Sequence, residues 1–90
     1  MQQKRAVVSV IGQDQVGIIS SVTTILSNQG VNILDISQTI LQDFFTMMMI
    51  VDVSTTELNS LQHSLNNISE ELGLKIHVQL EETFQAMHRV

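Results

Sequence analysis

A short run bounded by two glycines, Gly12-Gln13-Asp14-Gln15-Val16-Gly17, stands between an apolar strand pattern and a helical pattern. Glycine at both ends permits a tight turn and a close approach of the backbone to a bound molecule. The following helix adds free backbone N–H groups and the positive end of its dipole, so the corner could hold an anion or a carboxylate. A two-glycine turn is a weak motif, however. A structural turn in which Asp14 caps the helix explains the same residues.

Side chains suited to catalysis or metal binding are scarce in this sequence. Without cysteine there is no disulfide framework, thiol nucleophile or thiolate metal site. The three histidines, His63, His77 and His88, lack the i, i+4 spacing of a helical metal pair. No serine stands in the glycine context of a nucleophile elbow, and the acidic residues near the predicted hairpin are expected to be solvated. We therefore predict that the protein is not an enzyme and has no cofactor and no metal site.

Length and charge narrow the class of protein further. Ninety residues allow one domain with a modest core that gains stability from oligomerisation. The net charge is −5 and the four basic residues are scattered, which argues against nucleic acid as a partner. The longest apolar run, Phe44 to Val51, is too short to cross a bilayer, and no signal-peptide pattern opens the chain. A soluble cytoplasmic protein with no membrane partner is expected.

Hydrophobic periodicity predicts the first three elements around the corner. Residues Ala6 to Ile11 form a β-branched run with the length of a buried strand. After Gly17 a helical stripe of apolar residues continues almost to Gly30, so a helix is expected between these two glycines. Val31 to Leu41 alternates apolar and polar residues, which predicts a strand with one wetter face.

The second half of the chain repeats the order strand, helix, strand. Phe44 to Val53 is apolar at nearly every position, which favours a central strand covered on both faces and joined to the previous strand in a hairpin. Ser54 and Glu57 have the spacing of a capping box, and leucines at helical spacing continue to Gly73. From Leu74 to Leu80, apolar and polar residues alternate, which predicts an edge strand with one polar face.

The C-terminal tail, residues 81–90, carries Phe84, Met87 and His88 at helical spacing and predicts a short amphipathic helix. In the apolar strand before the second helix, Met47 to Met49 point to alternate faces, so at least one of them lies away from the helices. An uncovered apolar sheet face promotes aggregation. We therefore expect self-association, or cover of this face by the tail.

The predicted order is β-α-β-β-α-β in a single domain, residues 1–90. Two split βαβ units with right-handed crossovers place both helices on one face of a four-stranded antiparallel sheet. This is an α+β, ferredoxin-like architecture. Because the fold hosts many unrelated functions, it does not identify one by itself.

Two stretches carry a family pattern: Gly12-x-Asp14-x-x-Gly17-Ile18, and, after an apolar helix, Gly30-Val31-Asn32-Ile33-Leu34-Asp35-Ile36. Together they closely resemble the ACT domain, a small amino-acid-sensing module of metabolic regulation, and the likeness spans nearly the whole chain. Residues 32–40 and 84–89 are similar to the short stand-alone ACT-domain proteins of prokaryotes. The chain is also similar to the ACT modules of the glycine-cleavage repressor and of formyltetrahydrofolate deformylase, but no catalytic domain follows here.

The resemblance implies regulation and a ligand site shared by two copies of the chain. In ligand-binding ACT domains, the first strand-helix corner of one subunit and the start of the second strand of its neighbour enclose a small amino acid. The matching ligand-binding positions are Gly12, Gln13, Asp14, Gln15, Val16, Gly17 and Ile18 in one copy and Val31, Asn32 and Ile33 in the other. Where amino-acid-binding members often carry an amide, this chain has Asp14, which favours an ammonium group. Asn32 could supply an amide to the ligand, and a turn asparagine after Gly30 explains it equally well.

The function predicted from the sequence is a homodimeric, non-catalytic regulatory domain that senses an amino acid or related metabolite at the dimer interface and acts on a partner protein. The alternative is a ligand-free interaction module that docks on a metabolic enzyme or regulator through its sheet edge or tail. Two enzyme or carrier classes of this architecture do not fit. Acylphosphatase needs an arginine in the corner, and metallochaperones need Cys-x-x-Cys; both are absent.

Overall fold

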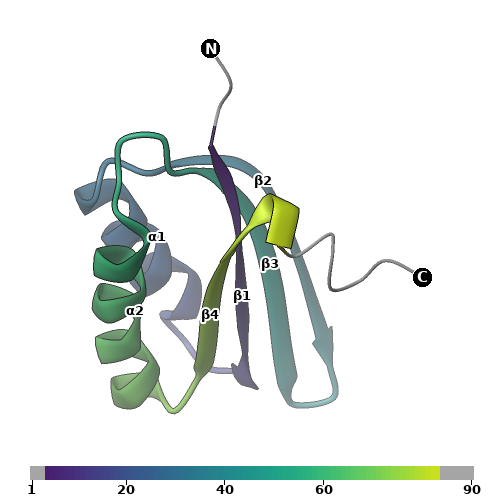
Figure 1. The fold of residues 1–90 in the computed structure, drawn as a ribbon. Coiled ribbons are helices and arrows are strands. Elements are labelled where there is room, and N and C mark those ends of the chain that lie inside the picture. Colours follow the sequence, from purple (N-terminus) through teal and green to yellow (C-terminus); the bar gives the residue numbers. More distant parts are fainter. Residues whose placement is uncertain (1–3, 84–90) are drawn as a thin grey trace.

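The computed structural model describes residues 4–83, which form one sheet and two helices (Figure 1). In chain order the elements are β1 (Arg5–Gln13), α1 (Ile18–Asn28), β2 (Asn32–Leu41), β3 (Phe44–Asp52), α2 (Leu58–Leu72) and β4 (Lys75–Leu80). Residues 81–83 are helical, in agreement with the start of the predicted C-terminal helix. The remaining residues of that prediction, 84–90, lie outside the described residues. The glycine-bounded helix and the hairpin strands are confirmed.

The sheet is antiparallel throughout, with the strand order β2-β3-β1-β4. Both helices pack on the same side of it, as Figure 1 shows. The predicted ferredoxin-like βαββαβ architecture is therefore confirmed, and so is the edge position of β4. In the part of the chain that the structure describes, no helix is long and apolar enough to cross a membrane.

The hydrophobic core lies between the helices and one face of the sheet. Because side chains alternate along a strand, every second residue of β3 is buried: Phe45, Met47, Met49 and Val51 are each no more than 3% exposed. They meet the apolar stripes of the helices, which recur at helical spacing. The fully buried side chains of these stripes are Val22 and Leu26 of α1 and Leu61 and Leu65 of α2.

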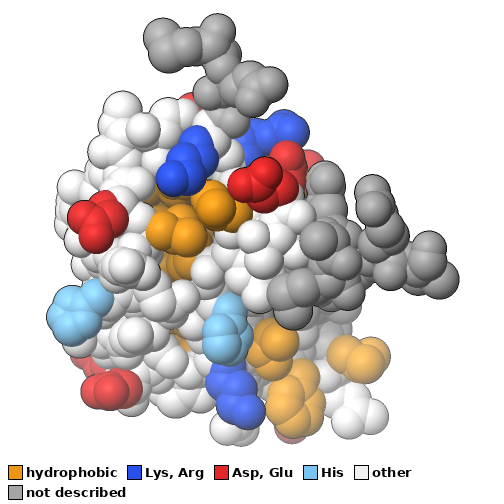
Figure 2. Space-filling model, viewed as in Figure 1, with side chains coloured by type: hydrophobic (Ala, Val, Ile, Leu, Met, Phe, Trp, Pro, Cys, Tyr) orange, Lys and Arg blue, Asp and Glu red, His pale blue; other side chains and the backbone are white. Residues whose placement is uncertain are grey.

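The prediction that β3 is covered on both faces is wrong. The sheet face turned away from the helices, called the open face below, leaves Phe44 63% and Met48 37% exposed. Both helices lie on the same side of the sheet, so neither of them covers the other face of β3 (Figure 1). Figure 2 shows apolar side chains gathered at the lower right, where Figure 1 has the β2–β3 hairpin.

Strand β2 departs from its prediction in a different way. Its alternation is present, since Ile36 and Ile40 pair with the helix-side residues of β3. These two isoleucines are nevertheless 44% and 53% exposed, because β2 is the outermost strand and α1 leaves its helix side largely open. A register shift between Ile33 and Asp35 makes Leu34 the extra residue of a β-bulge. Just after the bulge, the Ile36 N–H donates to Asp35 Oδ1 at 2.8 Å.

The capping box predicted at Ser54 does not form. Helix α2 begins at Leu58 after Glu57, and no side chain caps it. The Ser54 hydroxyl instead donates to Asp52 Oδ1 at 2.6 Å and accepts the backbone N–H of Lys4 at 3.1 Å. The Asp52 carboxylate thus engages the Ser54 hydroxyl in place of the start of α2. Short polar side chains in turns commonly make such local hydrogen bonds.

The hydrogen bonds from Ser54 make a testable prediction about pH. The Ser54 hydroxyl, and then its backbone N–H, hold the pKa of the exposed Asp52 carboxyl below its ordinary value. The stabilisation by this turn is therefore complete above the ordinary aspartate pKa and is lost as the pH falls through the lowered one. We expect Ser54→Ala to raise the pKa of Asp52, measured by NMR titration of its carboxyl carbon. Ser54→Thr, which keeps the hydroxyl, should leave it low, and equal values in both variants would contradict this reading.

Candidate functional site

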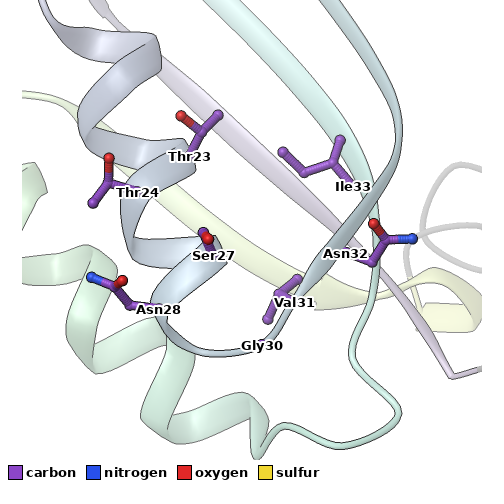
Figure 3. A pocket seen from close by; sticks show the side chains of 8 residues that line it. All are labelled: Thr23, Thr24, Ser27, Asn28, Gly30, Val31, Asn32 and Ile33. Atoms are coloured by element: carbon purple, nitrogen blue, oxygen red, sulfur yellow. The ribbon is translucent and has the colours of Figure 1, made fainter.

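Two cavities lie along the flank of the molecule formed by α1 and β2. The first, called the corner cavity, has a volume of about 540 Å³ and lies beside the turn before α1. It is lined by Asp14, Gln15, Gly17, Ile18, Ile19, Ser20, Thr23, Gln38, Ile40 and Phe45. The second, called the β2 cavity, has a volume of about 710 Å³ and lies where α1 ends and β2 begins (Figure 3). It is lined by Thr23, Thr24, Ser27, Asn28, Gly30, Val31, Asn32 and Ile33.

The turn at the corner cavity is closed by Gly17, which precedes the first residue of α1. Gly17 has φ 96°, a left-handed conformation that favours glycine, and a Cβ there would meet no atom within 4 Å. No side chain caps α1, so the alternative interpretation, in which Asp14 caps this helix, is wrong. The start of α1 therefore keeps the uncapped N–H groups and positive dipole end that could face an anionic group.

The residues before Gly17 are held in place by hydrogen bonds to two distant segments. The Asp14 N–H donates to the carbonyl oxygen of Asp43 in the β2–β3 turn at 2.7 Å. Gln15 Nε2 donates to the carbonyl oxygen of Leu72, at the end of α2, at 2.8 Å. These bonds occupy the Asp14 N–H and the Gln15 side-chain amide. They do not involve the carboxylate of Asp14, a residue that lines the corner cavity. Among the residues lining either cavity, Asp14 carries the only ionic side chain.

The remaining predicted corner residues have different surroundings. Gly12 and Gln13 belong to β1 and pair with Phe45 and Phe44 of β3. A Cβ on Gly12 would lie 2.5 Å from Leu74 Cδ2, so this glycine allows the close packing of β1 against the start of β4. Val16 is fully exposed at the tip of the turn. Ile18 has its side chain in the core, at 2% exposure, although it also borders the corner cavity.

The β2 cavity contains the other predicted group. Val31 is 6% exposed, and its N–H donates to the Leu26 carbonyl at 2.9 Å, which ties the start of β2 to α1. Figure 3 shows the Ile33 side chain directed toward α1, whereas Asn32 points to the other side of β2. This agrees with the pairing of Asn32 with the open-face residue Asp52. Asn32 therefore borders the cavity without directing its amide at α1.

Within one chain the two predicted groups do not share a cavity. They lie at opposite ends of α1, whose 11 residues span about 16 Å, and Thr23 alone borders both cavities. Three hydroxyl residues of α1 that line the cavities, Ser20, Thr23 and Ser27, were not predicted from the sequence as site residues. Their spacing of three and four residues is the signal that could have identified them. Thr23 and Ser20 also bond to carbonyl groups of their own helix, which explains them without a ligand.

Among residues 4–83, no group of three or more histidine, aspartate or glutamate side chains is placed to hold a metal ion. The chemistry available at the two cavities is therefore that of one carboxylate, several hydroxyls and amides, and the free N–H groups at the start of α1.

Comparison with known proteins identifies the family. The ACT domain model matches residues 4–79. A UPF0237 protein of Listeria innocua is 48% identical over 88 residues, which cover 96% of this chain and 99% of that protein. The structure of an ACT domain protein from Streptococcus pneumoniae superposes with a TM-score of 0.80 and 33% identity, over 97% of this chain and 100% of that one.

Two larger proteins share the fold. A formyltetrahydrofolate deformylase from Pseudomonas syringae has a TM-score of 0.81 at 18% identity, over 89% of this chain and 28% of that one. The regulatory subunit of aspartate kinase from Thermus thermophilus has a TM-score of 0.70 at 21% identity, over 87% of this chain and 52% of that one. At these identities the likeness concerns the fold. The match of the ACT domain model over residues 4–79 and the 33% identity to the Streptococcus pneumoniae protein show that this chain belongs to the ACT domain family.

Proposed function

We propose that the protein is a homodimeric regulatory domain that binds an amino acid or a related metabolite between its two copies. The ligand would lie between the corner of one copy, Gly12 to Ile18, and the start of β2 of the other, Val31 to Ile33. The observation that carries this proposal is the α1–β2 flank. There an unpaired sheet edge with exposed isoleucines runs between two separate cavities.

Pairing through β2 would bring the two cavities together. The start of β2 borders the β2 cavity, whereas Gln38 and Ile40, near its end, border the corner cavity. When two identical edge strands pair antiparallel, the start of each lies beside the end of the other. A two-fold axis through the strand pair then sets each corner cavity against the partner's β2 cavity. One dimer would contain two equivalent sites, and each site would be incomplete in a single chain.

The lining groups favour a zwitterion with a single carboxylate. The Asp14 carboxylate would attract an ammonium group, and the uncapped N–H groups at the start of α1 would donate hydrogen bonds to a carboxylate. Among the residues that the structure describes, no lysine or arginine lines either cavity, so phosphorylated ligands and dicarboxylates would leave negative charge unpaired. The hydroxyls of Thr23 and Ser27 and the amide of Gln38 suit a small polar side chain.

Binding between copies would regulate through the geometry of the dimer. A ligand that contacts both copies stabilises the arrangement in which the contacts are complete, by its differential affinity for that arrangement. A partner protein that distinguishes dimer geometries could then respond. The likeness in fold to a regulatory subunit of aspartate kinase supports this class of function. The alternative is a ligand-free module that docks on an enzyme or regulator through the exposed edge of β2.

A thermal-shift screen tests the proposal. The purified protein is screened against the twenty amino acids and common one-carbon and nucleotide metabolites. At about 100 times its dissociation constant, a selective ligand should add about 2.7 kcal/mol to the free energy of unfolding. Asp14→Ala should remove most of this shift, because the ammonium group loses its counter-charge. Asp43→Ala removes an equal charge outside both cavities and should preserve it.

Two results would count against the proposed site. If Asp14→Ala and Asp43→Ala responded equally to the ligand, the corner cavity would not hold it. If no compound shifted the melting temperature at millimolar concentration, the ligand-free docking module would become the better interpretation.

A further inference from the structure

A third cavity lies on the open face of the sheet, on the opposite side from the helices. Its volume is about 240 Å³, and its floor is formed by Val7 of β1 and by Met48 and Ile50 of β3. Asp35 and Glu81 stand at its rim. Glu81 Oε1 also lies 2.8 Å from Nη2 of Arg5, so one of the two carboxylates already has a basic partner.

The size and chemistry of this open-face cavity suit a side chain better than a metabolite. Small-molecule sites usually enclose about 300–1,000 Å³, more than this cavity provides. Its apolar floor suits an aromatic or long aliphatic group, and the acidic rim suits a chain that is basic beyond that group. Among the described residues, no lysine or arginine lines the cavity, so the charge of Asp35 has no cation beside it there.

We propose that the open-face cavity is the docking site for residues 84–90 of the same chain, with the Phe84 ring between Val7, Met48 and Ile50. The chain arrives at this point, because Glu81 lines the cavity and residue 84 follows three positions later. Residues 84–90 contain apolar Phe84 and Met87, basic His88 and Arg89, and no acidic residue. This composition complements both the floor and the rim.

Docking there would protect one of three consecutive methionines. Met48 is 37% exposed on the open face, whereas Met47 and Met49 point into the core and are 0% exposed. Oxidation of methionine by peroxide follows the exposure of the sulfur. The rate at which Met48 is oxidised therefore reports on cover of the open face, and Met47 and Met49 report on the integrity of the core. The open face is not part of the proposed ligand site, so failure of either proposal leaves the other standing.

The experiment compares three proteins: the full chain, a chain ending at Thr83, and the full chain with Phe84→Ser. Each is treated with hydrogen peroxide at several protein concentrations, and oxidation is followed by peptide mass spectrometry. We expect Met48 to be oxidised roughly threefold faster or more in both variants, at all concentrations. Met47 and Met49 should stay protected. Asn67→Ala, at an exposed position of α2 on the other side of the sheet, should leave the Met48 rate unchanged.

Other results would overturn the proposal. Equal Met48 rates in the full chain and in Phe84→Ser would show that Phe84 does not cover the cavity. Protection that is the same in all proteins and disappears on dilution would show that a second copy covers the open face instead. If the chain ending at Thr83 exposes Met47 and Met49 because it does not fold, Phe84→Ser and Asn67→Ala still decide the question.

Discussion

Leu65→Ala is expected to lower the free energy of unfolding by about 2–5 kcal/mol, the range for removing a fully buried leucine. Leu65 is 0% exposed and lies on the stripe by which α2 packs against the sheet. Helices α1 and α2 contact each other as well as the sheet, so the lost side chain leaves a cavity that rigid elements surround. Denaturant titration measures the change at a fixed protein concentration, because the proposed dimerisation would make stability depend on concentration.

A matched control lies on the same helix. Asn67 is exposed on α2, and Asn67→Ala should change the free energy of unfolding by no more than about 0.5 kcal/mol. The denaturant slope should stay the same in both variants, since the fold is kept. A Leu65→Ala protein as stable as the Asn67→Ala protein would mean that α2 is not packed on the sheet as described.

If two copies pair through β2 as proposed, Ile36→Lys should abolish dimerisation and, with it, the proposed response to ligand. In a single chain Ile36 is 44% exposed on the helix side of β2, so a lysine there is tolerated by the monomer. In a dimer paired through β2, each copy would bury the charge of that lysine at a cost of several kcal/mol. Each 1.4 kcal/mol weakens association about tenfold, so the variant should sediment as a monomer at concentrations where the parent chain is dimeric.

Ile11→Lys provides a control with the same change of side chain and nearly the same starting exposure, 46%. Ile11 is on the open face of β1, an inner strand, and away from the β2 edge. It should remain dimeric and retain the ligand-dependent shift in melting temperature. If Ile11→Lys became monomeric and Ile36→Lys stayed dimeric, the dimer would form through the open face, and the proposed shared site would be wrong.

The order and type of the elements could be predicted from local patterns. Gly17 and Gly30 bound α1 because the backbone is not helical at these positions, and both glycines have positive φ. The alternation of side chains along a strand correctly predicts that at least one of Met47 to Met49 lies away from the helices, and Met48 is that residue. These features depend on neighbours in the sequence, which a single sequence displays.

Features that depend on distant segments could not be predicted in the same way. The exposure of Ile36 follows from the outer position of β2 and from how little of it α1 covers. Ser54 fails to cap α2 because Asp52 and the backbone of Lys4 engage its hydroxyl. The direction of Asn32 follows from its pairing with Asp52 across the sheet. The residues of the candidate site are a prediction from the sequence, and ligand binding by them stays a prediction. Their division between two cavities required the structure.

The bulge in β2 has a consequence for how the length of this protein can change in evolution. Leu34 is the bulged residue, which has no pairing partner on β3, since Ile33 pairs with Val51 and Asp35 pairs with Ile50. An in-frame loss of the Leu34 codon would straighten the strand and leave Ile36 on its present side. Loss of a residue further along, such as Ser37, would invert the side chains on one side of the gap, because strand side chains alternate. Relatives one residue shorter in this strand should therefore carry their gap at the bulge.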